Sequence, residues 1–306
     1  MPSTALGRFK ASEGMRFQKL FSNVAIKAAS SGDEVESFHK RLLPENLVSL
    51  SSDRGKELFR EALIAGDMES FFPLSEQFLT QSEPAFCALT SLAMVLNALN
   101  HDPGKVWKGI WRWTSEETLR CESNETCGHA FEDFKVNGVS FSEFESLAAC
   151  HGIEMLSYRA GERINHAADR AVHDKLCGKH ELHDCQHDHR QTYSASKWKE
   201  LEGADAAAKN MTPLDKFRSF IDQSCRNNRG NLFIIANFDR QALGQTGSGH
   251  FSPIGGFHRE QDLVLIMDVA RFKYPPWWVP VKDLWRAMSI GDPQTEESRG
   301  YFVARS

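Results

Sequence analysis

The chain has 306 residues, of which 41% are hydrophobic and 25% charged, a composition typical of a soluble globular protein that buries a core. The formal net charge of −5 is small and the basic residues are scattered, so nothing indicates binding to nucleic acid. The longest apolar run, residues 232–236, is far shorter than the roughly 20 residues that span a bilayer, which argues against a membrane protein.

The N-terminal segment and the cysteines bear on the compartment. Residues 1–32 contain five basic residues and one acidic residue, without the apolar stretch of a secretory signal. Residues 1–40 are therefore expected to be a leader, and a disordered leader is favoured over an organellar transit peptide. The seven cysteines are odd in number and irregularly spaced, which favours a reducing, cytoplasmic location over a secreted disulfide scaffold.

Two helices are predicted in the first part of the chain. Apolar residues within 53–63 follow the i, i+3, i+4 spacing of a helix. A leucine stripe over residues 89–99 predicts a second helix, which begins after Pro84 and ends at the breaker 102–104. Cys87 lies in or beside its first turn. A helix N-terminus favours a thiolate, so we expect a lowered pKa for this thiol.

The second part of the chain predicts a sheet. Residues 160–212 are rich in His, Asp, Lys and Ala and are interpreted as an insertion. Three β-branched and aromatic runs separated by turns follow and predict an antiparallel meander: 231–238, 250–257 and 263–269. Helices followed by strands indicate an α+β fold, with an N-terminal helical lobe and a C-terminal antiparallel sheet. We expect one catalytic domain over residues 41–290 and a tail over 291–306.

The meander places a base beside a carboxylate. A hairpin turning near residues 258–262 pairs residues whose numbers sum to about 520, and His250 and Asp268 sum to 518. These side chains are expected opposite each other on neighbouring strands, and on one face if the turn is regular. With Cys87 they supply a thiol, a base that deprotonates it and a carboxylate that orients the base. Taken singly, each residue also has an ordinary structural explanation.

Two further features concern this predicted site. Gln81, just upstream of Cys87, is suited to donate a hydrogen bond to an oxyanion, although it can also be a polar loop residue. The 163 residues from Cys87 to His250 exceed the roughly 130–150 usual in papain-like enzymes. The insertion at 160–212 accounts for the excess.

The insertion contains a tract of seven imidazoles and thiols, here called the His/Cys tract. Such side chains suit zinc, copper or cadmium ions. The spacing matches no zinc-site pattern, and a solvated loop explains the composition equally well. The residues of the His/Cys tract are His173, Cys177, His180, His183, Cys185, His187 and His189.

Long motifs in both parts of the chain are similar to those of one family. They occupy residues 81–87, 95–99, 102–105, 107–113, 249–256 and 268–276. On these motifs the chain resembles the phytochelatin synthases, over about residues 41–159 and 213–290. The resemblance implies a papain-like fold and an acyltransferase, a glutathione γ-glutamylcysteinyltransferase with a cysteine nucleophile.

The resemblance also implies roles for individual residues. Cys87 attacks the cysteinyl-glycine amide of glutathione, glycine leaves with a proton from His250, and a second glutathione resolves the γ-glutamylcysteinyl thioester. Asp268 orients His250, and Gln81 stabilises the oxyanion. Residues expected to bind the substrate are Glu83, Phe86, Arg271, Lys273 and Tyr274. Arginine and lysine suit this role because glutathione carries two carboxylates.

The expected partners are glutathione and phytochelatin peptides, and a homodimer is left open. Heavy-metal ions such as Cd²⁺, Zn²⁺ or Cu²⁺ are expected as activators and as metal thiolates of the substrate, which would make the reaction part of heavy-metal detoxification. One alternative is a glutathione hydrolase on the same scaffold, which releases γ-glutamylcysteine and glycine. A second is a metal-buffering protein, suggested by the seven cysteines and twelve histidines. A general peptide protease is the weakest alternative.

Overall fold

A computed structural model describes five stretches of the chain: residues 39–120, 131–153, 155–160, 211–226 and 231–305. The chain divides into two units, Met1–His39 and Lys40–Ser306, and every element given below belongs to the second. The expected leader and the His/Cys tract lie outside the described residues.

The first three helices of the described chain lie between the first strand of the sheet and the others, and the third helix is the most deeply buried. They are α2 (Asp53–Ile64), α3 (Phe71–Glu76) and α4 (Cys87–Ala98). The hydroxyl of Ser52 accepts a hydrogen bond from the backbone N–H of Gly55 and caps α2. Both predicted helices are confirmed. In α4 every residue from Ala88 to Ala98 is buried, whereas Cys87 at its N-terminus is only half-buried.

The sheet has seven antiparallel strands among the described residues. In spatial order they are β1 (Val48–Ser49), β8 (Trp277–Pro280), β7 (Leu263–Ile266), β6 (Gly249–His258), β5 (Leu232–Asp239), β9 (Gly300–Arg305) and β4 (Met155–Arg159). The predicted meander is confirmed as β5, β6 and β7. The expected tail at 291–306 is wrong as a domain boundary, because β9 pairs with β5 and β4 inside the sheet.

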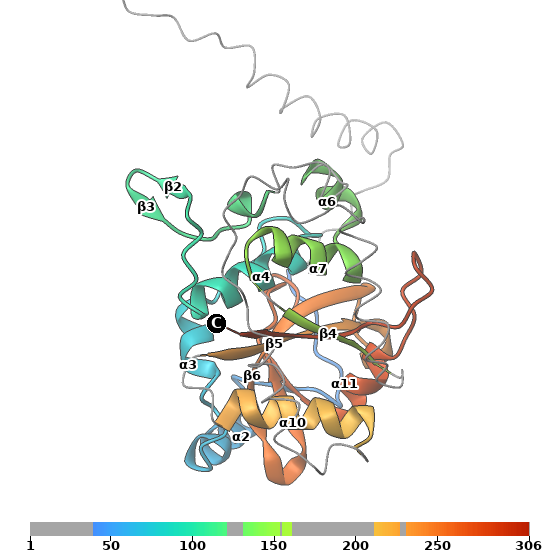
Figure 1. The fold of residues 1–306 in the computed structure, drawn as a ribbon. Coiled ribbons are helices and arrows are strands. Elements are labelled where there is room, and N and C mark those ends of the chain that lie inside the picture. The colour runs from blue at the N-terminus through green and yellow to red at the C-terminus, as the bar shows by residue number, and fades with distance from the viewer. Residues whose placement is uncertain (1–38, 121–130, 154, 161–210, 227–230, 306) are drawn as a thin grey trace, which may run out of the picture. The chain divides into compact units, whose positions relative to one another are not determined.

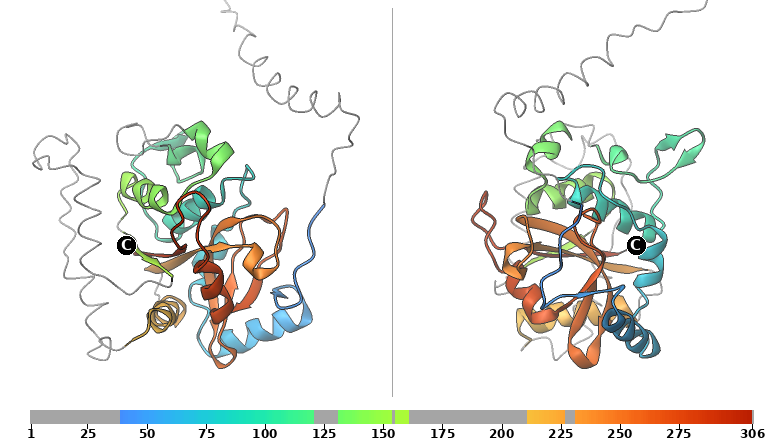
Figure 2. Two further views of the ribbon diagram at one scale, coloured as in Figure 1. Left: turned by 90° about the vertical axis from the view of Figure 1, so that its right-hand side faces the viewer. Right: turned by 180° about the vertical axis from the view of Figure 1, so that it is seen from behind.

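Helices cover both faces of the sheet (Figures 1 and 2). On one face, α4 and α7 (Phe141–Cys150) pack against Phe233 and Ile235, in a core that also includes residues of α6 (Phe131–Asn137). On the other face, α10 (Pro213–Arg226) and α11 (Val281–Met288) pack against Ile234. The residues of β5 alternate between the two cores because successive side chains of a strand point to opposite faces.

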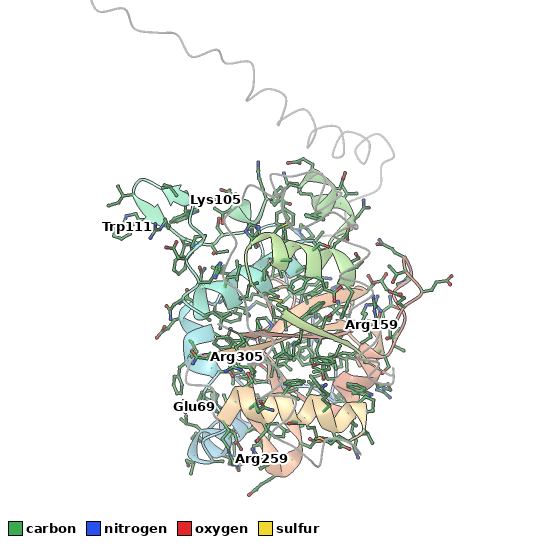
Figure 3. All side chains as sticks on the ribbon, viewed as in Figure 1. Glu69, Lys105, Trp111, Arg159, Arg259 and Arg305 are labelled. Carbon is green, nitrogen blue, oxygen red and sulfur yellow. The ribbon has the colours of Figure 1, made fainter. Side chains whose placement is uncertain are left out.

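A small second sheet stands apart from the main one. The hairpin of β2 (Val106–Lys108) and β3 (Trp111–Arg112) projects from the body, with Trp111 exposed near its end (Figure 3). The remaining described elements are the 3₁₀ turns η1 (Glu117–Leu119), η3 (Gln241–Leu243) and η4 (Arg259–Gln261). None of the described helices is long and apolar enough to span a bilayer.

Candidate active site

The start of α4 opens onto a cavity of about 450 Å³. Its walls come from the loop before α4, the segment 136–141 from the end of α6 to the start of α7, the turn after β5, the start of β6, the loop 270–273 and the segment before β9. Reactive or charged side chains in this wall are those of Gln81, Cys87, Arg240, His250, Lys273, Asp292 and Arg299. The predicted nucleophile and the predicted base therefore face one space.

An irregularity in the β6–β7 hairpin sets which side chains share a face. Next to the turn, paired residues sum to 521, as in Phe257 with Val264, whereas Ile254 pairs with Ile266 and sums to 520. The extra residue, Gly255, is a bulge. Without it, the side chain of His250 would point away from Asp268, because a shift of one residue reverses the face.

Glycine at the bulge also has a steric reason. A Cβ at Gly255 would lie 2.7 Å from Cγ of Met267, which is closer than packed atoms approach.

The predicted proximity of His250 and Asp268 is confirmed, since Nε2 of the imidazole lies 3.1 Å from Oδ1 of the carboxylate.

His250 is held through one ring nitrogen. Its Nε2 contacts Asp268 and lies 2.9 Å from Oγ of Ser252, which is fully buried. Nε2 is therefore the nitrogen that the carboxylate keeps protonated, and Nδ1 is the nitrogen left to accept a proton from a thiol. The contact with Asp268 fixes the orientation of the ring, which is the geometry that a nucleophile–base pair requires of its third group.

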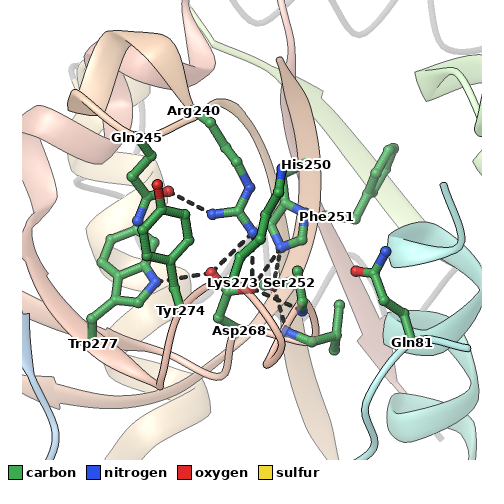
Figure 4. A network of polar contacts seen from close by, with 12 residues as sticks. Gln81, Arg240, Gln245, His250, Phe251, Ser252, Asp268, Lys273, Tyr274 and Trp277 are labelled. Carbon is green, nitrogen blue, oxygen red and sulfur yellow. Dashed lines mark hydrogen bonds and ion pairs between the residues drawn. The ribbon is translucent and has the colours of Figure 1, made fainter. Parts of the chain in front are cut away.

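Arg240, which the sequence analysis missed, binds the buried carboxylate. Its Nη2 donates to both oxygens of Asp268, at 2.9 and 3.0 Å, and its Nη1 donates to Gln245 at 2.6 Å. The indole N–H of Trp277 and the backbone N–H of Ala270 also donate to Asp268. Figure 4 shows Arg240 and Trp277 reaching the carboxylate of Asp268 from two sides. A buried charge with this many partners is strongly fixed in place.

Gln81 lines the cavity, and its amide is engaged with the loop itself. The Nε2 group donates to the carbonyl oxygens of Glu83 and Pro84, at 2.9 and 2.8 Å. Its Oε1 is buried and has no hydrogen-bond partner among the described residues. Figure 4 shows Gln81 across from His250. Donation to an oxyanion therefore requires that the amide release one carbonyl.

The residues expected to bind the substrate are placed unequally. Lys273 lines the cavity, and its ammonium donates to the carbonyl oxygen of Thr246. Tyr274 and Phe86 are buried in the core, 1% and 4% exposed. Tyr274 supports the wall, since its hydroxyl accepts a hydrogen bond from the backbone of Thr246.

Two of these residues lie outside the cavity wall. Arg271 is exposed and stacks on the ring of Phe78, with 4.7 Å between the guanidinium carbon and the ring centre. Glu83 is half-buried and contributes a backbone carbonyl to Gln81.

A second arginine missed in the sequence does line the cavity. Arg299 is 1% exposed, and its Nη1 donates to the carbonyl oxygens of Ile290 and Gly291. Its Nε and Nη2 have no hydrogen-bond partner within the described residues, although Nη2 lies 3.3 Å from the carboxylate of Asp292. The side of the guanidinium that carries Nε and Nη2 lies against Gly249, where a Cβ would be 3.2 Å from Nε. Two N–H groups side by side are the geometry that binds a carboxylate.

The expectation of a lowered thiol pKa is wrong. Burial raises the pKa of Cys87 above its ordinary value. The backbone N–H of Phe251, the charge of Arg240 and the backbone N–H of Ala88 act in the opposite direction and offset only part of this effect. The helix N-terminus does favour the thiolate, but the removal of water outweighs it.

His250 shows the complementary shift. Burial, and then the charge of Arg240, lower the pKa of its imidazole from 6.5 to about 4, against the opposing effect of Asp268. Both shifts favour the neutral thiol and the neutral imidazole over a thiolate–imidazolium pair, and a neutral imidazole can accept a proton.

This lowered pKa predicts a pH dependence. Between pH 4 and 6.5 the unfolded chain binds more protons at His250 than the folded chain, so its contribution to stability is complete above about pH 6.5 and is lost towards about pH 4. An NMR titration of the His250 ring, assigned by its absence in His250→Gln, should give a midpoint near 4. A midpoint at or above the ordinary histidine value would contradict this electrostatic picture.

The described residues contain no group of three or more His, Cys, Asp and Glu side chains placed to hold a metal ion. The His/Cys tract lies outside the described residues, so its expected metal binding stays a prediction.

The fold and the site together define a class. A thiol at the N-terminus of a buried helix and an imidazole on an antiparallel sheet line one cavity, and a carboxylate holds that imidazole. This is the arrangement of papain-like enzymes, in which a cysteine forms an acyl intermediate.

Comparison with known proteins identifies the family. The family model described as phytochelatin synthase matches residues 38–301, and the chain belongs to this family. Glutathione gamma-glutamylcysteinyltransferase 2 of Arabidopsis thaliana is 38% identical over 267 residues, covering 87% of the chain and 46% of the relative. Glutathione gamma-glutamylcysteinyltransferase 1 of Lotus japonicus is 37% identical over 266 residues, covering 87% of the chain and 42% of the relative. The Schizosaccharomyces pombe glutathione gamma-glutamylcysteinyltransferase is 34% identical over 284 residues, covering 93% of the chain and 55% of the relative. The chain spans about half the length of the curated relatives it matches.

Proposed function

We propose that this chain carries the catalytic site of a glutathione γ-glutamylcysteinyltransferase, which makes phytochelatins by transferring a γ-glutamylcysteinyl unit through a thioester on Cys87. The observation that carries the proposal is the nucleophile and its oriented base on one cavity, in a chain 34–39% identical to proteins named for this reaction. Three cationic side chains in the wall, Arg240, Lys273 and Arg299, suit a peptide with two carboxylates.

In the first half of the reaction, Nδ1 of His250 takes the thiol proton as the sulfur of Cys87 attacks the carbonyl carbon of the cysteinyl-glycine bond. The tetrahedral intermediate collapses as the imidazolium returns the proton to the glycine nitrogen. Glycine leaves and the thioester remains. Asp268 stabilises the transient imidazolium, and Arg240 holds that carboxylate ionised.

The second half repeats the proton transfers in reverse. The amino group of a second glutathione, or of a growing peptide, attacks the thioester carbon while His250 accepts its proton. The sulfur then leaves and the proton restores the thiol. Backbone N–H groups at the start of α4 lie where an oxyanion forms in both halves. Gln81 joins them when its amide turns away from the loop.

Arg299 is the best-placed side chain to anchor a substrate carboxylate. Replacing it by glutamine removes a charge-assisted bidentate hydrogen bond, which predicts a KM for glutathione raised about 10- to 100-fold. Alkylation of Cys87 by neutral iodoacetamide should stay near the wild-type rate, because the thiol itself is untouched. Arg299→Lys keeps the charge without the paired N–H groups and should be intermediate.

The matched control is Arg271→Gln, which removes an arginine that lies outside the wall. It should change KM less than Arg299→Gln. The reverse order of the two variants would show that the carboxylate binds outside the cavity described here.

Metal ions enter this proposal as part of the substrate. Cd²⁺, Zn²⁺ or Cu²⁺ would bind the thiols of glutathione, and the metal thiolate would be the acceptor peptide. The His/Cys tract remains a proposed activator site. A cytoplasmic location is proposed because the reaction needs reduced glutathione, and Cys87 and Cys225 are free thiols in the described part of the chain.

Product analysis tests the proposal. The chain is incubated with glutathione and cadmium, and the products are separated and weighed by mass spectrometry. Peptides longer than glutathione, formed together with glycine, support the transferase. Glycine and γ-glutamylcysteine without longer peptides would instead indicate the hydrolase, since water then resolves the thioester.

A further inference from the structure

The loop that presents the nucleophile is held by polar contacts on two sides. On its inner side, the backbone N–H of Gln81 donates to the carbonyl oxygen of Val269, at 3.0 Å. On its outer side, Ser82 is exposed, and its backbone N–H lies 3.1 and 3.3 Å from the two carboxylate oxygens of Glu116. The hydroxyl of Ser82 donates to the same carboxylate.

Glu116 also reaches α4. Its carboxylate contacts the hydroxyl of Thr90, which lies 2.8 Å from the carbonyl oxygen of Phe86, the residue before the nucleophile. One side chain therefore contacts both ends of the loop 81–86, directly at Ser82 and through Thr90 at Phe86.

The position of Glu116 is itself fixed. Two residues earlier, the backbone of Thr114 exchanges hydrogen bonds with the side chain of Asn97 at 2.8 and 3.2 Å. Asn97 and Thr90 are seven residues apart on α4 and so share a helix face. Three residues later, Leu119 is fully buried in the core. The carboxylate is thus anchored on both sides along the chain.

We propose that Glu116 is a positioning residue, whose carboxylate fixes the loop 81–86 and thereby the places of Cys87 and the Gln81 amide. The Gln81 amide binds the carbonyls of Glu83 and Pro84, so a shift of the loop moves the proposed oxyanion donor together with the nucleophile. Misplacement of reacting groups by about 1 Å can cost about 100-fold in rate. The inference deepens the proposed function, on which it rests.

The test compares Glu116→Ala, Glu116→Gln and the control Glu117→Ala, which removes the exposed neighbouring carboxylate. We expect Glu116→Ala to lower kcat for glycine release about 10- to 100-fold with little change in KM. Glu116→Gln should stay within about 3-fold of wild type, because the amide can accept from Ser82 and donate to Thr90. A kcat near wild type in Glu116→Gln would show that the hydrogen bonds of this side chain matter, and that its negative charge does not. Thermal unfolding shows that each variant is folded at the assay temperature.

A double-mutant cycle with Ser82→Ala sharpens the test. If both residues act through one contact, Ser82→Ala should lower kcat in the wild-type background and have little further effect beside Glu116→Ala. Equal kcat values for Glu116→Ala and Glu117→Ala would overturn the proposal, as would fully additive effects in the cycle.

A substrate-independent measurement distinguishes failure of this inference from failure of the proposed function. The rate of iodoacetamide alkylation at Cys87, read by peptide mass mapping, should change at least about 3-fold in Glu116→Ala and not in Glu117→Ala. A wild-type chain that releases no glycine from glutathione would refute the function, and the alkylation rates would still decide the role of Glu116. Equal alkylation in all variants would then overturn it.

Discussion

Replacing Cys87 by alanine should abolish glycine release from glutathione, with kcat reduced about 10⁴-fold or more. The reason is that the cavity supplies one thiol beside one base, and the proposed route to either product passes through an acyl group on that sulfur. The measurement is glycine formed per chain over time at saturating glutathione. The substitution removes one half-buried atom, so the fold should be retained.

The matched control is Cys150→Ala, which removes another half-buried thiol at the C-terminus of α7. This variant should retain glycine release. If Cys87→Ala kept full activity while Cys150→Ala lost it, the nucleophile would be wrongly assigned. If Cys87→Ala changed only the amount of metal bound, the metal-buffering alternative would become the better account.

Replacing Arg240 by methionine should both destabilise the fold and lower the rate. Arg240 is 2% exposed and Asp268 is fully buried, so the variant leaves an uncompensated buried carboxylate, which costs about 3–5 kcal/mol of unfolding free energy. With the carboxylate free to move or to take a proton, His250 loses its orientation. We expect kcat/KM to fall about 100-fold or more. Urea unfolding and steady-state kinetics measure the two effects.

A double-mutant cycle tests the ion pair between Arg240 and Asp268 directly. The double variant Arg240→Met with Asp268→Asn carries no buried charge at this point, so its loss of stability should be smaller than the sum of the two single losses. Its activity should not fully recover, because an amide stabilises an imidazolium less than a carboxylate does and Arg240 no longer holds the side chain at position 268 in place. Additive losses of stability would contradict a direct ion pair. Arg240→Lys, which keeps the charge without the fork, serves if the methionine variant does not fold.

The central residues of the site were predictable because each leaves a local signal in the sequence. The leucine stripe after Pro84 located the helix that begins at Cys87, and the hairpin arithmetic joined His250 to Asp268. The bulge at Gly255 was not predictable from residue numbers. It corrects the register by one residue. Glycine suits the position because a Cβ would lie 2.7 Å from Cγ of Met267, a contact that only the tertiary structure shows.

The two arginines of the site leave no such signal. Arg240 follows a strand like many charged turn residues, and only the fold brings it to Asp268. Arg299 lies in a polar stretch that resembles a tail, whereas it directly precedes β9, which pairs with β5 and β4 inside the sheet. A signal was present in the apolar run Tyr301–Ala304, which alone could have indicated the strand.

The thiol pKa was mispredicted for a related reason. The position of Cys87 at a helix N-terminus can be predicted from the sequence. It correctly predicts that the helix lowers the thiol pKa. Burial depends on what covers the residue, which here is β6 and the loop before α4. Its effect on Cys87 is larger, and it sets the direction of the shift.

The most direct measurement is the mass of Cys87 after brief reaction with glutathione, trapped by acid and mapped by peptide. The account predicts an adduct of γ-glutamylcysteine minus water on Cys87, formed with one equivalent of glycine and consumed when a second glutathione is supplied. A mass equal to whole glutathione in disulfide linkage, or an acyl group on a different residue, would contradict the thioester mechanism.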